Sequence, residues 1–339
     1  MVKINKTYVI NLTHRKDRWQ QVNNNFKNSS LKLNRWNAVN GKKLDDSKIR
    51  ELTTNFCYLF CSPGMIGCWL SHATLWKHIV KNKEDNVLII EDDAFPVPDF
   101  NERIVRILQE IPNDYDLVYF GCIGTCEKNI NWLYSLLNGK SNKEIYYKNK
   151  KLEDIVKPAF PLATHGYMVS YKGALKLLNN EKIKKIIYHI DFSLANYVYD
   201  DKNEFRVYAL VPPLINQDFD SKTSDIATLQ HPLINYPLSK IHLTNSLNMD
   251  YFNNVQISYV RKLGVPITIF FVILLGISIF FGLTFSIEFI SYYLIFITSI
   301  YCLEIFINKG KNVKIMFFEL ILIILATLIS HSIKKNKIN

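Results

Sequence analysis

The most informative segment of this 339-residue chain is Val87-Leu-Ile-Ile-Glu-Asp-Asp-Ala-Phe95. Its first four residues are apolar and mostly β-branched, which is typical of a buried strand. The strand runs directly into three carboxylates, Glu91, Asp92 and Asp93. Clustered acids beside a core are costly unless a cation neutralises them, and hard oxygen ligands at a strand end suit a divalent metal that holds a diphosphate. A solvated turn is the alternative, because Asp is common where strands stop.

Strands and helices alternate on both sides of this segment. The patterns predict strands at 7–12, 34–39, 116–121, 163–170 and 205–210, and helices at 18–28, 64–83, 100–109, 172–178 and 191–196. This alternation predicts an α/β domain with a mainly parallel sheet, in which ligands bind outside the carboxyl ends of the strands. We expect residues 127–157 to form a long polar insertion and residues 214–255 to be irregular.

The composition excludes some classes of partner. The formal net charge of +11 suits contact with anionic lipid or a nucleotide-sugar. No Lys/Arg stripe with interleaved aromatic residues is present, so we expect no nucleic-acid binding. Two cysteine pairs have C-x3-C spacing, 57/61 and 122/126, for which a joint zinc site is conceivable. Buried free thiols are favoured, because the usual C-x2-C pairs and spaced histidines are missing.

The C-terminal quarter is strongly apolar. Three segments, about 265–285, 289–307 and 315–333, are candidate transmembrane helices, and the first is long enough to cross a bilayer unaided. They predict two domains, a globular one over 1–255 and a membrane region over 256–339 with two to three spans. The N-terminus lacks a secretory signal, so we expect a multi-pass membrane protein whose globular domain faces the cytosol.

Four motifs follow one another in order through the globular part. They are Tyr8-Val-Ile-Asn-Leu-Thr-His-Arg-Lys-Asp-Arg-Trp19, Gly64-Met-Ile-Gly-Cys-Trp-Leu-Ser-His-Ala-Thr-Leu-Trp-Lys77, Leu88-Ile-Ile-Glu-Asp-Asp-Ala94 and His165-Gly-Tyr-Met-Val-Ser170. With these motifs the chain resembles glycosyltransferase family 25 over roughly residues 5–230. The resemblance implies a Rossmann-like, nucleotide-diphosphosugar-binding fold of the GT-A type, a UDP-sugar donor, an inverting transfer and usually Mn²⁺, with Mg²⁺ as the alternative.

The acidic segment matches the metal-binding element of such enzymes. Glu91 and Asp93 have the spacing of the D-x-D element and are the expected metal ligands, whereas Asp92 between them is assigned to the donor. His165 is a candidate for a further metal ligand or a sugar contact, and a structural histidine is the alternative.

Further polar residues lie where the donor is expected. Asn11, Arg15 and Arg18 follow the first strand and can bind a nucleotide and its phosphates, unless they form only a solvated basic turn. Ser71 and His72 lie on the helix before the acidic strand. Contact with the donor sugar or ribose and helix packing are both open for these two residues.

An inverting transfer also needs a base that takes the proton of the acceptor hydroxyl. Asp191 matches a family position and is the candidate, with a helix N-cap as its alternative. Gln217 and Asp225 match the last family pattern and are candidates for shaping the acceptor side.

These residues together predict a membrane-anchored, metal-dependent glycosyltransferase. It is expected to move a hexose, galactose by preference, from a UDP-sugar to a hydroxyl of a glycan, lipid-linked glycan or glycoprotein. The alternatives are a non-catalytic membrane protein that binds sugar nucleotide or glycan, and a membrane scaffold or transport component.

Overall fold

The computed structural model describes residues 2–123, 155–158, 160–200, 205–218, 231–243 and 248–338. The chain divides into two compact units, Met1–Phe219 with His242–Leu247, and Asp220–Ile241 with Asn248–Asn339. The predicted functional domains, 1–255 and 256–339, stay predictions. Most of the predicted insertion, and Asp225, lie outside the described residues.

The first unit contains a seven-stranded sheet with the order β2-β1-β3-β7-β5-β8-β6. The strands are β1 (Lys6–Asn11), β2 (Leu33–Asn37), β3 (Val87–Glu91), β5 (Leu117–Ile123), β6 (Ile155–Val156), β7 (Leu162–Val169) and β8 (Val207–Leu210). The α/β prediction is confirmed, and the sheet is rich in parallel strands, since β1, β2, β3, β5 and β8 run in one direction. In the described part of the chain β7 runs antiparallel between β3 and β5, and β6 runs antiparallel to β8.

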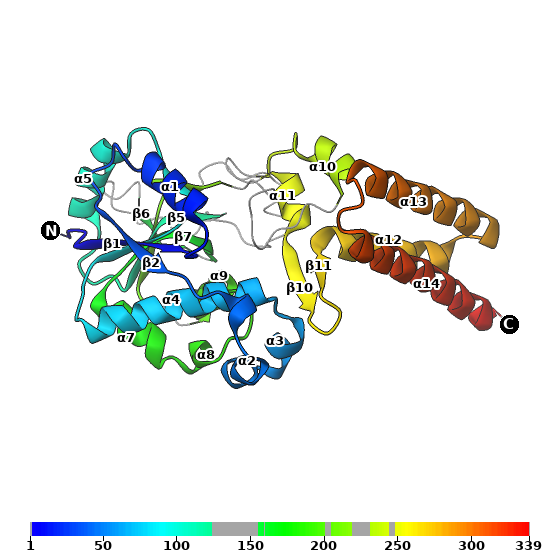
Figure 1. Ribbon diagram of the computed structural model, residues 1–339, viewed down its shortest axis with the longest axis horizontal. Coiled ribbons are helices and arrows are strands. Elements are labelled where there is room, and N and C mark those ends of the chain that lie inside the picture. The colour runs from blue at the N-terminus through cyan, green and yellow to red at the C-terminus, as the bar shows by residue number, and fades with distance from the viewer. Residues whose placement is uncertain are drawn as a thin grey trace. The chain divides into compact units, whose positions relative to one another are not determined.

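Helices cover both faces of this sheet (Figure 1). Helices α4 (Pro63–Lys81), α7 (Tyr171–Asn179) and α9 (Ile190–Asp200) pack into one apolar core, and α1 (Lys16–Asn25) and α5 (Phe100–Glu110) pack into the other. The remaining elements of the unit are short: η1 (Gly41–Lys43), α2 (Asp46–Leu52), α3 (Asn55–Phe60), β4 (Ala94–Pro96), α8 (Glu181–Lys184) and β9 (Ile215–Gln217).

Strand β3 is buried because its side chains alternate between the two cores. Val87 and Ile89 belong to the core under α4, whereas Leu88 and Ile90 belong to the core under α1 and α5. All four are fully buried, which explains the continuous apolar run in the sequence. The same burial directs the following carboxylates to the edge of the sheet.

Helix α4 packs so closely against the segment that precedes it that only glycine fits at two contact positions. A Cβ added at Gly67 would meet the carbonyl oxygen of Val39 at 2.6 Å, and one at Gly41 would meet the carbonyl oxygen of Pro63 at 1.7 Å. The Ser62 side chain accepts a hydrogen bond from the Met65 N–H and caps the helix. These contacts fix where α4 lies against the sheet.

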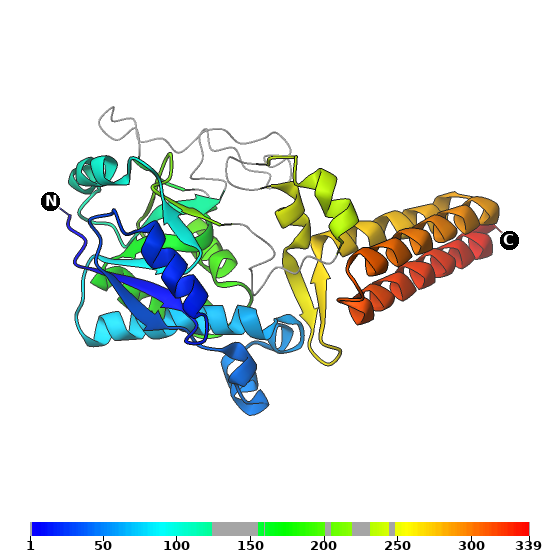
Figure 2. The same cartoon turned by 45° about the horizontal axis from the view of Figure 1, so that its top comes forward.

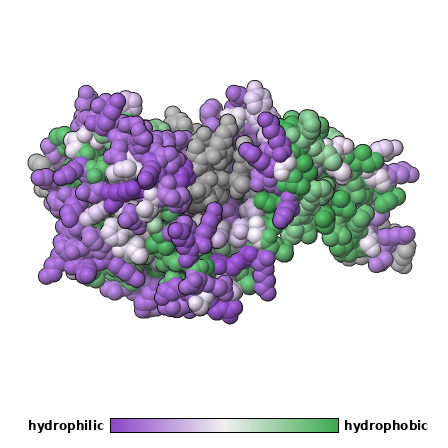
Figure 3. All heavy atoms as spheres, viewed as in Figure 1, coloured by the Kyte–Doolittle hydropathy of each residue, from purple (hydrophilic) through white to green (hydrophobic). Residues whose placement is uncertain are grey.

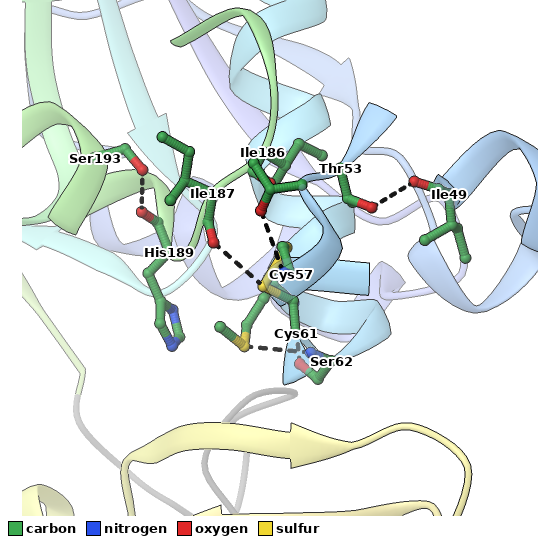
Figure 4. Close-up of a disulfide and its surroundings, with 11 residues drawn as sticks. Ile49, Thr53, Cys57, Cys61, Ser62, Ile186, Ile187, His189 and Ser193 are labelled. Atoms are coloured by element: carbon green, nitrogen blue, oxygen red, sulfur yellow. Dashed lines mark hydrogen bonds between the residues drawn. A yellow bond between two sulfur atoms is a disulfide. The ribbon is translucent and has the colours of Figure 1, made fainter. Parts of the chain in front are cut away.

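The predicted free thiols at residues 57 and 61 are wrong, because Cys57 and Cys61 form a disulfide at α3 (Figure 4). Both cysteines are fully buried. Nearby, Thr53 forms an isolated parallel bridge with Ile186. The spacing of one helical turn brings the two sulfur atoms together, a geometry that the sequence analysis did not consider. The disulfide thus lies beside the segment that leads into α9.

The second unit corrects two predictions. Residues 214–255 are not all irregular, and residues 265–268 form a strand instead of the start of a membrane span. Its elements are α10 (Pro232–Leu238), α11 (Met249–Asn254), β10 (Gln256–Val260), β11 (Val265–Thr268), α12 (Ile269–Thr284), α13 (Ile287–Ile307) and α14 (Val313–Ile338). The prolines of α10 obscured its helical pattern, and Pro266 together with pairing to β10 favours a strand.

Two helices of this unit, α13 and α14, are long and apolar enough to cross a membrane, by length and composition only. Helix α12 has 16 residues and is shorter than a bilayer core requires of an unaided span, so the span predicted over 265–285 stays a prediction. The three helices lie side by side (Figure 2). Only 22% of the residues in the apolar window of α13 and 33% in that of α14 are buried, and apolar residues gather on the visible face of these helices (Figure 3).

The two acids inside α13 and α14 are fully buried within the second unit. Glu304 accepts hydrogen bonds from the backbone N–H groups of Leu233 and Ile234 at 3.0 and 3.1 Å. A ring nitrogen of His231 lies 3.0 Å from Glu319, which also accepts a hydrogen bond from the Tyr301 hydroxyl. Both acids thus bind residues in or next to α10 through hydrogen bonds.

Candidate functional site

The three carboxylates at the end of β3 are largely buried, yet they face different partners. The side chains of Glu91, Asp92 and Asp93 are 21%, 12% and 19% exposed. Glu91 ends the strand, and the two aspartates form the turn that leads into β4. The turn is therefore held inside the first unit and is not a solvated loop.

Asp92 is bound by the protein itself. The Arg18 guanidinium donates to one of its oxygens at 3.0 Å and the Asn11 amide donates to the other at 2.6 Å. Burial raises the pKa of Asp92, although the Arg18 charge and the Asn11 hydrogen bond oppose the rise. The predicted neighbours Asn11, Arg18 and Asp92 are thus brought together, in a buried ion pair that fixes the turn to β1 and α1.

Glu91 receives two hydrogen bonds from the other side of the site. The Thr164 hydroxyl donates to its Oε1 atom at 2.6 Å, and His72 Nε2 lies 3.3 Å from the same atom. Burial by itself raises the pKa of Glu91, but the hydrogen bonds from His72 and Thr164 and the nearby imidazoles together outweigh it, so the pKa of this carboxyl is lowered. Glu91 is therefore held as an anion.

Asp93 is the least satisfied of the three acids. Gln217 donates to its Oδ2 atom at 3.2 Å and Arg18 lies 3.8 Å from that atom, whereas Oδ1 is buried and has no hydrogen-bond partner among the described residues. Burial, and then the charges of Glu91 and Asp92, raise the pKa of Asp93 to about 7. A cation at Oδ1 would relieve this unfavourable burial.

A chain of hydrogen bonds orients His72. Trp76 Nε1 can only donate, and it donates to the Tyr167 hydroxyl at 2.9 Å. That hydroxyl lies 2.9 Å from His72 Nδ1. With the Tyr167 proton directed to Nδ1, the other nitrogen of His72 carries its hydrogen towards Glu91. The chain thus begins in the core and ends on a carboxylate of the site.

Replacing Tyr167 with Phe is expected to lower the free energy of unfolding by about 1–3 kcal/mol, because Trp76 Nε1 then stays buried without an acceptor. The matched control is Tyr119→Phe, since Tyr119 is equally buried but its hydroxyl has no partner in the described part of the chain. Urea unfolding of both variants measures the difference. Equal losses would contradict the hydrogen-bond chain.

Two other residues that were predicted to bind the sugar-nucleotide donor make contacts within the protein. Arg15 pairs with Asp17 at 2.9 Å, and this partner lowers the pKa of Asp17 to about 2. Ser71 donates to the Gly67 carbonyl at 2.6 Å and accepts from the Val39 N–H at 2.8 Å. The contacts of Ser71 are those of helix packing, the alternative that the sequence left open.

The candidate base and the candidate third ligand are also bonded to the backbone. Asp191 lies in the first turn of α9 and accepts from the N–H groups of Ala163 and Phe192 at 3.2 and 2.7 Å. Ala163 has a positive φ of 67°, which is uncommon for a non-glycine residue. His165 is buried, with Nε2 3.2 Å from the Ile215 carbonyl, and burial lowers the pKa of its imidazole.

Sequence reasoning missed several residues of the site. Arg35 on β2 donates to Asn11 and to the carbonyls of Leu12 and Thr13. Thr164 lies directly before His165, which was predicted as a site residue, and Tyr167 lies two residues after it. Alternation along β7 was the signal available for Tyr167, but its bond to Trp76 spans 91 residues. Such pairings cannot be read from a single sequence.

The first unit is thus an α/β domain with an acidic site at the carboxyl ends of β1 and β3. A family description, "Glycosyltransferase family 25 (LPS biosynthesis protein)", matches residues 4–194, more than half of the chain. The chain belongs to glycosyltransferase family 25, as its motifs predicted.

Curated relatives support the same assignment. A "Glycosyltransferase 25 family member" of Aedes aegypti is 29% identical over 194 residues, which cover 54% of this chain and 29% of that protein. A protein of the same name from Drosophila melanogaster is 30% identical over 55% of this chain and 29% of its own length. The "Procollagen galactosyltransferase 1" of Danio rerio is 27% identical over 54% and 30%. The chain therefore spans about a third of the length of these relatives.

Proposed function

We propose that this chain is a metal-dependent glycosyltransferase that moves a hexose, galactose by preference, from a UDP-sugar to a hydroxyl of a glycan, lipid-linked glycan or glycoprotein, with inversion. The observation that carries the proposal is Asp93, a largely buried carboxyl beside the anionic Glu91, with one oxygen that has no hydrogen-bond partner in the described part of the chain. The relatives named procollagen galactosyltransferases support galactose as the sugar.

The donor set fits a hard divalent cation, Mn²⁺ or Mg²⁺. Asp93 and Glu91 offer carboxylate oxygens, and the unpartnered Oδ1 of Asp93 needs positive charge. When bound, such a cation supplies a Lewis acid that stabilises negative charge on the departing diphosphate. Arg18 contributes a second positive charge 3.8 Å from Asp93. His165 is the candidate for a further ligand, since its Nδ1 is buried without a partner among the described residues.

The proposed fold is of the GT-A type. Support comes from the acidic turn beyond β3 and from Asn11 at the carboxyl end of β1, two neighbouring strands that run parallel. We assign Asn11, Arg15, Arg18, Ser71, His72 and Asp92 to the side of the site that binds the donor. Ser71 and Asp92 are positioning residues there: Ser71 bonds Gly67 and Val39, and Asp92 binds Asn11 and Arg18.

Asp191 is the proposed base that takes the proton of the acceptor hydroxyl. Its two oxygens each accept one backbone hydrogen bond, and a carboxylate oxygen can accept another. Its charge helps to raise the pKa of the Cys68 thiol, after burial itself and Glu91.

We also propose that α13 and α14 anchor the chain in a membrane. Their exposed apolar surface and their buried acids are what such spans require. The side of the membrane on which the first unit lies, predicted as cytosolic, rests only on the sequence. Resistance of the protein to extraction from membranes by alkaline carbonate tests the anchor.

The function is tested by release of UDP. Full-length protein in detergent is expected to release UDP from one UDP-hexose when an acceptor glycan and Mn²⁺ are present, and to stop when EDTA is added. The backbone bonds at both oxygens of Asp191 favour the alternative, a non-catalytic sugar-nucleotide-binding protein. Calorimetric binding of UDP-galactose without UDP release under any acceptor condition would establish that alternative.

A further inference from the structure

Three potential metal ligands meet on the α4 side of Glu91. Cys68 Sγ, a ring nitrogen of His72 and a carboxylate oxygen of Glu91 all lie within 4.8 Å of one another. Cys68 and His72 are one turn apart on α4, so both side chains lie on the same face of the helix. His72 Nε2 is 3.3 Å from Glu91 Oε1, a separation that two ligands of one tetrahedral ion have.

The surroundings of the cluster hold its ligands in place. Tyr167 fixes His72 through Nδ1, so that Nε2 faces the cluster, and Thr164 fixes Glu91. Hydrogen bonds of this kind orient ligands around protein-bound metals. Cys68 is not disulfide-bonded, and it is partly exposed, as is Glu91, so an ion can enter. The proposed transfer reaction gives Cys68 no role.

We propose that Cys68, His72 and Glu91 form a second cation site that selects thiophilic divalent ions such as Zn²⁺ over Mn²⁺ and Mg²⁺. A thiolate and an imidazole are soft ligands and favour zinc, whereas Asp93 and Glu91 offer only hard oxygens. A fourth position stays open to water, because three protein ligands are present.

Binding of the ion displaces one proton from Cys68 and moves another within His72. The Cys68 thiol forms a metal–sulfur bond and releases its proton to solvent. The His72 proton moves from Nε2 to Nδ1, which then donates to the Tyr167 oxygen. The Tyr167 hydroxyl keeps its own proton, turns it away from Nδ1 and still accepts the bond from Trp76. The site therefore binds more weakly at low pH.

Occupation of this site is expected to inhibit the enzyme. Glu91 belongs to both sites, so an ion shared with Cys68 and His72 withdraws it from the donor metal. This inhibitory role rests on the proposed function, whereas binding of the ion does not.

Cobalt titration of the full-length protein in detergent tests the site. The background is Cys302→Ser, which removes the free thiol that is exposed among the described residues. We expect a thiolate-to-cobalt charge-transfer absorption, which Zn²⁺ abolishes and a hundredfold excess of Mg²⁺ does not. Adding Cys68→Ser should remove the band, and adding His72→Gln should weaken Co²⁺ binding at least tenfold. Circular dichroism confirms that each variant is folded.

The outcomes separate the two proposals. Absence of the band, or its persistence after Cys68→Ser, overturns the second site and leaves the transfer reaction untouched. A band without UDP release under any condition supports the site and contradicts the proposed function. Zinc inhibition that is equal in Cys302→Ser and Cys68→Ser/Cys302→Ser overturns the inhibitory role.

Discussion

Replacing Asp93 with Asn is expected to abolish transfer and, at the same time, to stabilise the metal-free protein. Loss of the Asp93 carboxylate removes the proposed hard ligand, so we expect transfer to fall at least about a thousandfold. The stability gain follows from the pKa of Asp93, which is about 7 in the folded protein against an ordinary 3.8. A mutation that harms activity while it helps folding is the sign of a functional carboxyl.

The sign of the stability effect depends on pH. A carboxyl whose folded pKa is raised destabilises the folded state above its ordinary pKa, because the unfolded chain ionises more easily. The cost grows from about pH 4 and is complete above pH 7, where it reaches up to about 4 kcal/mol. Asp93→Asn is expected to gain that amount at pH 8 without metal, and below about 1 kcal/mol near pH 4.

Urea unfolding at both pH values, together with UDP release, measures these effects. Asp99→Asn is the matched control, because Asp99 is 54% exposed and its change is chemically identical. We expect the control to stay within about 0.5 kcal/mol of the unmutated protein. Turnover retained in Asp93→Asn would remove the metal assignment, and a loss of stability at pH 8 would show that Asp93 is well paired.

The second large effect is expected from Arg18. Replacing Arg18 with Met leaves the buried Asp92 and Asp93 without their nearest cation, which should lower the free energy of unfolding by about 3–5 kcal/mol at pH 8. The loss of stability should shrink towards pH 4. Burial raises the pKa of Asp92, so Asp92 takes up a proton there in the folded as well as in the unfolded state, and no buried charge is left without a partner.

A double-mutant cycle isolates the ion pair. Arg18→Met in an Asp92→Asn background is expected to lose at least about 1 kcal/mol less than Arg18→Met alone. The same replacement at Arg106, an exposed arginine on α5, serves as the control for loss of a surface charge. Additive losses in the cycle would mean that Arg18 stabilises the fold by packing and not through Asp92.

The sequence predicted those parts of the fold that rest on local pattern. The apolar run of β3, the helix from Pro63 and the acidic turn were all found, because burial on both faces and helical periodicity leave a local signal. The reversed direction of β7 was not found, since an antiparallel and a parallel buried strand have the same apolar pattern. Direction depends on pairing with β3 and β5, which are distant in sequence.

The candidate site was predicted in its acids but not in their partners. That Arg18 and Asn11 are near the acidic turn follows from their place after β1, next to β3. Asp92 is bound by these two residues, whereas one oxygen of Asp93 has no hydrogen-bond partner within the described ranges, and this difference depends on side-chain direction. Likewise, Cys68 was noticed only as one of six cysteines, because its distance from Glu91 is a property of the packed fold.

The two glycines at the close contact between α4 and the preceding segment affect how damaging substitutions should be interpreted. Gly41 and Gly67 contribute no side chain to the proposed sites, yet a methyl group at either would collide with backbone atoms and displace the helix that carries Cys68 and His72. In a saturation-mutagenesis screen they should therefore score as severely as the acidic residues. Inferring catalytic importance from such scores alone would confuse steric tolerance with chemistry.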